Sequence, residues 1–168
     1  GCALDRAAIE VHDIGLEVVN NDAGELGFRV LVGGGLGRTP IVGSCINEFL
    51  PWQHLLSYLE AVLRVYNRFG RRDNKFKARI KILVKALTPA IFAERVVDEW
   101  AHLKDGPITL TEEEVQRVSQ HFTDPAYLTL NDQDAELTAL DREHSGFARW
   151  RSRNVVAHKK PGYAAVTL

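Results

Sequence analysis

The first regular pattern in the chain is an alternation of apolar and polar positions. Residues 11–19 carry apolar side chains at alternate positions, and the turn-like run 20–24 follows them. Residues 27–32 then predict a returning strand, because strands place successive side chains on opposite faces. The two segments predict a β-hairpin, which ends in the glycine-rich segment 33–37.

Helical spacing begins after the hairpin. Pro51 suits the first position of a helix, and apolar side chains then recur every three or four residues until Gly70, a suitable C-cap. Residues 75–87 fit both a strand and a helix, and helix is favoured because the segment leads directly into another one. That next helix is predicted to follow an N-cap at Thr88 and to run through 89–103.

The pattern weakens towards the C-terminus. Residues 105–107 form a clear break, and Thr111 with Glu114 predicts a capping box for a short helix that ends near Phe122. The acidic stretch 131–143 has weak periodicity and resembles a linker laid across a surface.

Together these elements predict an α+β fold in three parts. Residues 1–105 should form a small mixed sheet packed by two long helices, and 106–149 an acidic helical linker. The last part, 150–168, is expected to hold a single strand. The 168-residue chain contains no Met and stops within that strand, so we expect it to be an excerpt of a longer protein.

Composition narrows the class of protein. The apolar fraction of 45% and the charged fraction of 26% are those of a globular protein. No apolar run is long enough to span a membrane and no secretory signal opens the chain, so a cytoplasmic protein without membrane partners is expected. Cys2 and Cys45 are too few to hold a metal cluster, and the six histidines show no metal spacing. No catalytic or metal-binding residue is assigned.

The net charge of −1 conceals two opposite blocks. Between Arg64 and Lys85 nine basic residues face the single acid Asp73, whereas ten acids lie between Asp105 and Glu143. The basic block fits either a solvated face or a polyanionic ligand. A nucleic-acid partner is not expected, because the pI is about 6.7 and no aromatic platform accompanies the block.

The glycine cluster leaves two interpretations open. Arg38 occupies the last glycine position of the G-x-G-x-x-G pattern, and no amphipathic helix opens there, so dinucleotide binding is disfavoured. Glycines at 33–37 fit either a tight turn or close approach of the backbone to a flat or anionic ligand. Residue chemistry alone therefore predicts an anion-binding module.

Two longer runs carry a resemblance to a known family. Residues 13–16 with 27–40, and residues 60–75, resemble the middle of sirohaem-dependent sulfite and nitrite reductases, closest to the bacterial assimilatory sulfite reductase haemoprotein. The spacing of a basic segment also resembles the sirohaem-binding stretch of that family. It comprises Gly70, Arg72, Lys75, Ala78, Arg79 and Lys81. The likeness covers residues 10–105 and resumes at 150–168.

The resemblance implies a function. Residues 1–105 would be a sirohaem-binding half-domain, and 150–168 the start of a second half-repeat. The parent enzyme would use sirohaem and a [4Fe–4S] cluster to reduce sulfite to sulfide, or nitrite to ammonia, by six electrons from a flavoprotein or ferredoxin. The residues implied to bind the cofactor are Gly33, Gly34, Gly35, Gly37, Arg38, Arg72, Asn74, Lys75, Arg79 and Lys81.

Departures from the family pattern limit this expectation. The L-P-R-K-F-K run that supplies substrate-site lysines should lie before Gly1, and the paired cysteine motifs for the cluster should lie beyond Leu168. Neither Cys2 nor Cys45 matches those motifs. The chain alone is therefore expected to be inactive and to expose surface that favours self-association. The alternative is a non-catalytic anion-binding or interaction module with the same fold.

Overall fold

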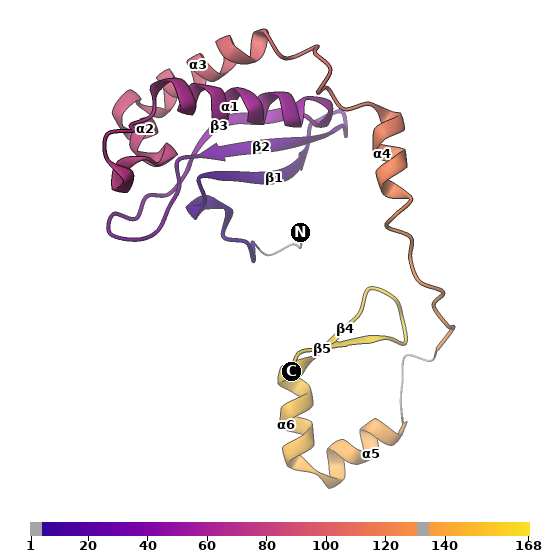
Figure 1. Ribbon diagram of the computed structural model, residues 1–168. Coiled ribbons are helices and arrows are strands. Elements are labelled where there is room, and N and C mark those ends of the chain that lie inside the picture. The colour runs from indigo at the N-terminus through magenta and orange to yellow at the C-terminus, as the bar shows by residue number, and fades with distance from the viewer. Residues whose placement is uncertain (1–4, 131–134) are drawn as a thin grey trace. The chain divides into compact units, whose positions relative to one another are not determined.

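The computed structural model describes residues 5–130 and 135–168. The chain divides into two compact units, 1–120 and 121–168, which are treated separately (Figure 1). The regular elements of the first unit are three strands, four α-helices and three 3₁₀ turns among the described residues. They are a 3₁₀ turn at Ile9–Val11, β1 (Ile14–Asn20), β2 (Leu26–Val32), β3 (Ser44–Pro51), a 3₁₀ turn at Trp52–His54, α1 (Leu55–Phe69), a 3₁₀ turn at Lys75–Lys77, α2 (Ile80–Leu87), α3 (Pro89–Ala101) and α4 (Glu112–Ser119).

The three strands form one antiparallel sheet in the order β1-β2-β3. The predicted hairpin of β1 and β2 is confirmed, with Glu17 opposite Arg29. The sheet is wholly antiparallel rather than mixed, and β3 was not predicted. Register shifts against β2 interrupt the alternation of buried and exposed positions in β3, so its sequence lacks a strand signature.

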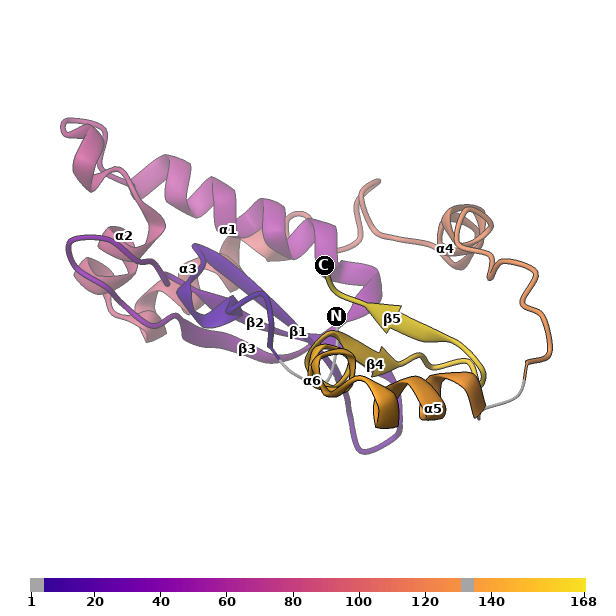
Figure 2. The same ribbon diagram turned by 90° about the horizontal axis from the view of Figure 1, so that it is seen from below.

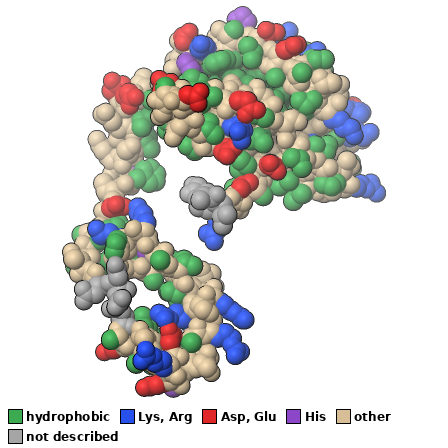
Figure 3. Space-filling model, turned by 180° about the vertical axis from the view of Figure 1, so that it is seen from behind, with side chains coloured by type: hydrophobic (Ala, Val, Ile, Leu, Met, Phe, Trp, Pro, Cys, Tyr) green, Lys and Arg blue, Asp and Glu red, His purple; other side chains and the backbone are tan. Residues whose placement is uncertain are grey.

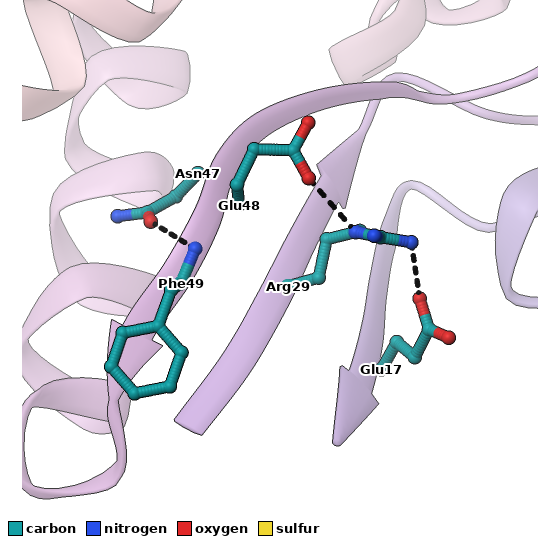
Figure 4. Close-up of polar contacts among 5 residues, drawn as sticks. All are labelled: Glu17, Arg29, Asn47, Glu48 and Phe49. Carbon is teal, nitrogen blue, oxygen red and sulfur yellow. Dashed lines mark hydrogen bonds and ion pairs between the residues drawn. The ribbon is translucent and has the colours of Figure 1, made fainter. Parts of the chain in front are cut away.

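Charged side chains on the three strands pair with one another beside the irregular part of β3 (Figure 4). Arg29 donates to Glu17 on β1 at 2.8 Å and to Glu48 on β3 at 2.9 Å. Beside this triad, Asn47 accepts a hydrogen bond from the backbone N–H of Phe49 at 3.1 Å, within its own strand. Such a local side-chain bond is an alternative to regular ladder pairing and accompanies the register shift.

Helices α1, α2 and α3 lie on one face of the sheet (Figures 1 and 2). The core between the sheet and the helices contains fully buried side chains from both layers. They are Val30 and Val32 from β2 and Tyr58, Val62 and Phe92 from the helices. Burying large apolar side chains contributes roughly 1.5–3 kcal/mol each. The predicted α+β class with helices packed on a small sheet is confirmed.

The start of α1 differs from the prediction. Pro51 ends β3 in an extended conformation, and α1 begins at Leu55 after a 3₁₀ turn. Gly70 closes the helix as predicted, and its N–H donates to the Tyr66 carbonyl at 2.8 Å. Its backbone is extended rather than left-handed. Glycine is required there because a Cβ would lie 2.5 Å from that carbonyl oxygen.

The ambiguous segment 75–87 is helical only in its second part. Asn74 accepts from the N–H of Phe76 at 3.0 Å and starts a single 3₁₀ turn, after which Arg79 is extended. Helix α2 then runs over Ile80–Leu87. The predicted N-cap at Thr88 is confirmed, since its hydroxyl accepts from the N–H of Ile91.

The last helix of the first unit follows a cap that the sequence predicted. The Thr111 hydroxyl accepts from the N–H of Glu114 at 3.3 Å, and α4 then ends at Ser119 rather than near Phe122. Leu110 donates its N–H to the Gln53 carbonyl at 2.9 Å, so the chain remains attached to the first unit well beyond residue 105.

Within its described residues, the second unit contains two helices and a small hairpin. They are α5 (Ala135–Glu143), α6 (Ser145–Asn154), β4 (Val155–Ala157) and β5 (Ala164–Val166), the strands being antiparallel. Segment 150–168 therefore holds the end of a helix and two strands, where one strand was predicted. Of the predicted linker 131–143, residues 131–134 lie outside the described residues and the rest is helical.

None of the helices within residues 5–130 and 135–168 combines the length and apolarity needed to cross a membrane.

Candidate functional site

The glycine segment after β2 folds back onto its own chain. Gly33 has φ +78° and donates its N–H to the Asp13 carbonyl at 2.9 Å. A Cβ on Gly34 would lie 2.3 Å from the Glu10 carbonyl oxygen, and one on Gly33 would lie 3.1 Å from Val84. Packing within the protein therefore requires glycine at position 34, the left-handed backbone favours it at position 33, and both residues are buried.

A short exposed loop follows the buried glycines. Gly35 and Ile41 exchange two backbone hydrogen bonds of 2.9 Å and close its neck, while residues 36–40 are exposed. Gly37 has φ +98°, and a Cβ there would have no atom within 4 Å. Of the four predicted glycines, Gly37 alone combines exposure with open space. It lies beside Arg38, which is also exposed.

Lys81 reaches this loop from the first turn of α2. Its side chain is only 7% exposed, and its Nζ donates to the carbonyls of Leu36 at 3.2 Å and Thr39 at 2.9 Å. A Cβ on Gly35 would lie 3.0 Å from Lys81 Cδ. Lys81 and Gly35 are therefore packed against each other, and the lysine binds backbone carbonyls.

Arg79 is paired with the beginning of the sheet. Its guanidinium donates to both carboxylate oxygens of Asp13, at 3.0 and 2.8 Å. Hydrogen bonding to this carboxylate raises the pKa of Arg79 above its ordinary value, although partial burial opposes the shift. A shallow groove of 450 Å³ adjoins the pair and is lined in part by Tyr66. No role was predicted for Asp13, because the residues around it give no sign of a partner 66 positions away.

The other predicted residues lie in the turn between α1 and α2. Arg72 donates to the Asn67 side chain at 3.0 Å, and its guanidinium lies 4.6 Å from the centre of the Tyr66 ring. Lys75 is exposed, and its Nζ is 5.2 Å from the ring of Phe76, itself 82% exposed. Asn74 uses its side-chain oxygen to cap the 3₁₀ turn.

The structure thus divides the ten predicted residues by environment. Gly35, Arg79 and Lys81 lie in one contact region with internal partners. Arg38, Arg72 and Lys75 are exposed cations, the first on the glycine loop and the other two on the turn before α2. Lys and Arg side chains gather at this end of the first unit (Figure 3), and such cations can form charge-assisted hydrogen bonds with anionic groups.

An iron–sulfur cluster does not fit the residues present. A [4Fe–4S] cluster requires about four thiolates, whereas the whole chain has two cysteines. Cys45 is exposed on β3, and partial desolvation of its sulfur together with a hydrogen bond to Glu48 raises the pKa of its thiol. Among the described residues, no three His, Cys, Asp or Glu side chains group as a metal site.

An α+β domain with a basic end is the class that fold and site define. Residues 1–104 match the family described as the nitrite and sulphite reductase 4Fe-4S domain. The chain therefore belongs to the nitrite and sulphite reductase family, and the family resemblance found in the sequence is confirmed for the first of its two stretches.

Individual relatives agree with this assignment. The ferredoxin sulfite reductase of Synechococcus elongatus is 37% identical over 91 residues, covering 50% of this chain and 15% of the relative. The NADPH sulfite reductase hemoprotein beta-component of Staphylococcus haemolyticus is 34% identical over 94 residues, covering 52% and 16%. The structure of the Mycobacterium tuberculosis NirA protein matches with a TM-score of 0.55 and 31% identity, covering 62% and 19%. The chain thus spans less than a fifth of each relative's length.

Proposed function

We propose that the chain is part of a sulfite reductase and that its first unit supplies part of the sirohaem-binding wall. The parent enzyme would reduce sulfite to sulfide, with nitrite as the alternative substrate. Its electron donor would be a ferredoxin or a flavoprotein, since the relatives are named as ferredoxin and NADPH enzymes. The parent is proposed to be cytoplasmic.

One observation carries the proposal: Arg38, Arg72 and Lys75 are exposed cations on the two turns that meet the start of α2, and one of these turns carries the open position Gly37. Arg38 lies on the loop itself, and Arg72 and Lys75 lie on the turn before α2. Sirohaem bears several carboxylates on the rim of a flat ring. Guanidinium and ammonium groups form charge-assisted hydrogen bonds with carboxylates, and a glycine without neighbours permits close approach of the ring.

The chain's own residues would bind and orient the cofactor. When bound, sirohaem supplies the iron at which the anion is reduced. Arg72 is already oriented by its bond to Asn67 and by its contact with the Tyr66 ring, so less side-chain entropy is lost when it binds a carboxylate. Because the chain has only two cysteines, the cluster thiolates of the parent would come from elsewhere.

We propose the following roles for the three parts of the chain that the sequence predicted. Residues 1–105 would be the cofactor-binding half-domain, 106–149 a linker, and 150–168 the beginning of the second half-repeat. We propose that the 168-residue chain alone does not reduce sulfite. Its self-association also stays a prediction.

Titration of the purified chain with sirohaem tests the proposal. A spectral shift with saturable binding is expected, and replacing Arg38, Arg72 and Lys75 with Gln should weaken binding by about tenfold or more, as for the loss of charge-assisted bonds. The control replaces three exposed basic residues elsewhere, Lys85, Lys104 and Arg149, with Gln. Absence of sirohaem binding would reject the wall and favour a non-catalytic anion-binding module.

A further inference from the structure

Lys81 differs from the exposed cations of the proposed wall because its ammonium group is buried. A buried ammonium ion costs several kcal/mol unless hydrogen-bonding partners replace its hydration. The partners that the structure provides are the carbonyls of Leu36 and Thr39. These two carbonyls flank Gly37 and Arg38 on either side. The lysine therefore holds the chain at both ends of the loop tip.

The packing around Lys81 supports the same role. The side chain passes directly beside Gly35, where a Cβ would lie 3.0 Å from Cδ and 3.3 Å from Nζ of the lysine. The paired backbone hydrogen bonds between Gly35 and Ile41 close the neck of the same loop. Glycine at position 35 thus admits the lysine stem, and the loop is held at its neck and near its tip.

We propose that Lys81 is a positioning residue that holds the 36–40 loop and thereby places Arg38, and that it does not itself contact the anionic ligand. The effect of Lys81 on ligand binding rests on the proposed function, whereas the attachment of the 36–40 loop by Lys81 does not. Arg79, two residues earlier, instead pairs with Asp13. Side chains on one short segment thus attach α2 separately to the loop and to the start of β1.

Limited proteolysis tests the hold on the loop. The bond after Arg38 is a trypsin site within the exposed loop, and K81M retains the apolar stem beside Gly35 while removing both hydrogen bonds. Cleavage after Arg38 should accelerate by about tenfold or more, because local opening governs such cleavage. Cleavage after Lys104 serves as the internal reference, and K85M, an exposed lysine on the same helix, as the matched control. Unchanged cleavage after Arg38 in K81M would overturn the proposal.

A second measurement uses the unmodified chain, so it does not depend on the folding of a variant. The ammonium protons of Lys81 should exchange with solvent at least about tenfold more slowly than those of Lys85, because only the former are buried and hydrogen-bonded. Equal exchange rates of the two ammonium groups would contradict the proposal that Lys81 holds the 36–40 loop.

A double-mutant cycle with sirohaem separates positioning from direct contact. If Lys81 acts through Arg38, K81M should weaken binding about fivefold in the original chain and less than about twofold when R38Q is already present. An undiminished loss in the R38Q background would place Lys81 on the ligand and reject the proposal. If neither the original chain nor any variant binds sirohaem, the proposed function fails. Proteolysis and proton exchange would still decide whether Lys81 holds the 36–40 loop.

Discussion

Arg79 and Asp13 form a bidentate pair although they lie 66 positions apart, with Nε to Oδ1 at 3.0 Å and Nη2 to Oδ2 at 2.8 Å. Asp13 directly precedes β1, and its backbone carbonyl also accepts the N–H of Gly33 at the end of β2. Arg79 is the residue before α2. The pair therefore attaches the start of a helix to the sheet and to the base of the glycine loop.

Removing the charge of Asp13 should weaken the first unit measurably. Both side chains are more than a third exposed, so D13N is expected to lower the free energy of unfolding in urea by about 0.5–1 kcal/mol. R79K should lose most of the same amount, because lysine cannot form the two-point contact. D73N is the control, since the Asp73–Arg71 pair spans only two positions. A loss in D13N no larger than in D73N would show that the long-range pair is not a tether.

Substitution of Gly34 should destabilise the protein in the absence of any ligand. A Cβ there would lie 2.3 Å from the Glu10 carbonyl and 2.6 Å from that of His12, both backbone atoms. G34A is therefore expected to cost about 1–3 kcal/mol of unfolding free energy, seen as a lower Tm. In G146A the new Cβ meets no atom within 4 Å and lies in α6, so a neutral or slightly stabilising effect is expected. A normal Tm in G34A would instead favour a role in ligand approach.

A buried hydrogen-bond chain should make Ser57 important for stability. Trp100 donates its indole N–H to the Ser57 hydroxyl at 3.0 Å, and that hydroxyl donates to the His54 carbonyl at 3.0 Å. Because Ser57 is fully buried, S57A should cost about 1–3 kcal/mol by leaving the indole N–H unpaired. In a W100F background the same change should cost at least about 0.5 kcal/mol less. Chemical denaturation followed by circular dichroism measures all four chains, and strict additivity would argue against the bond.

The N-terminus of α4 should respond to acid through two separable carboxyl groups. Hydrogen bonding to Arg117 lowers the pKa of Glu114, while bonds from its own backbone N–H and from Thr111 lower the pKa of Glu113. A depressed pKa in the folded state stabilises the fold above the unfolded-state value, about 4.3, and the contribution is lost as the pH falls through the folded-state value. The helix should therefore lose the stabilising contribution of these two carboxylates as the pH falls below about 4.3.

Carboxyl NMR titration of two variants assigns these shifts. R117Q should raise the pKa of Glu114 towards its ordinary value and leave Glu113 unchanged, whereas T111A should raise that of Glu113. Equal shifts of both groups in either variant would mean that the two carboxyls do not have separate partners.

Local patterns were sufficient for much of the fold. The hairpin of β1 and β2, the caps at Thr88 and Thr111, and the helix that closes at Gly70 all depend on residues close together in the sequence. Side-chain periodicity and capping chemistry act over a few positions, so sequence alone can reveal them. The family resemblance likewise came from contiguous runs and agrees with the match over residues 1–104.

Tertiary structure decided the environment of each predicted binding residue. The sequence could not distinguish the buried Lys81 from the exposed Lys75, because both belong to one basic block. Nor could it show that Gly34 and Gly35 face their own chain, or that Asp13 is the partner of Arg79. Burial and charge pairing depend on which distant segments meet, and only the packing of α2 against the glycine loop and the start of β1 determines that for this protein.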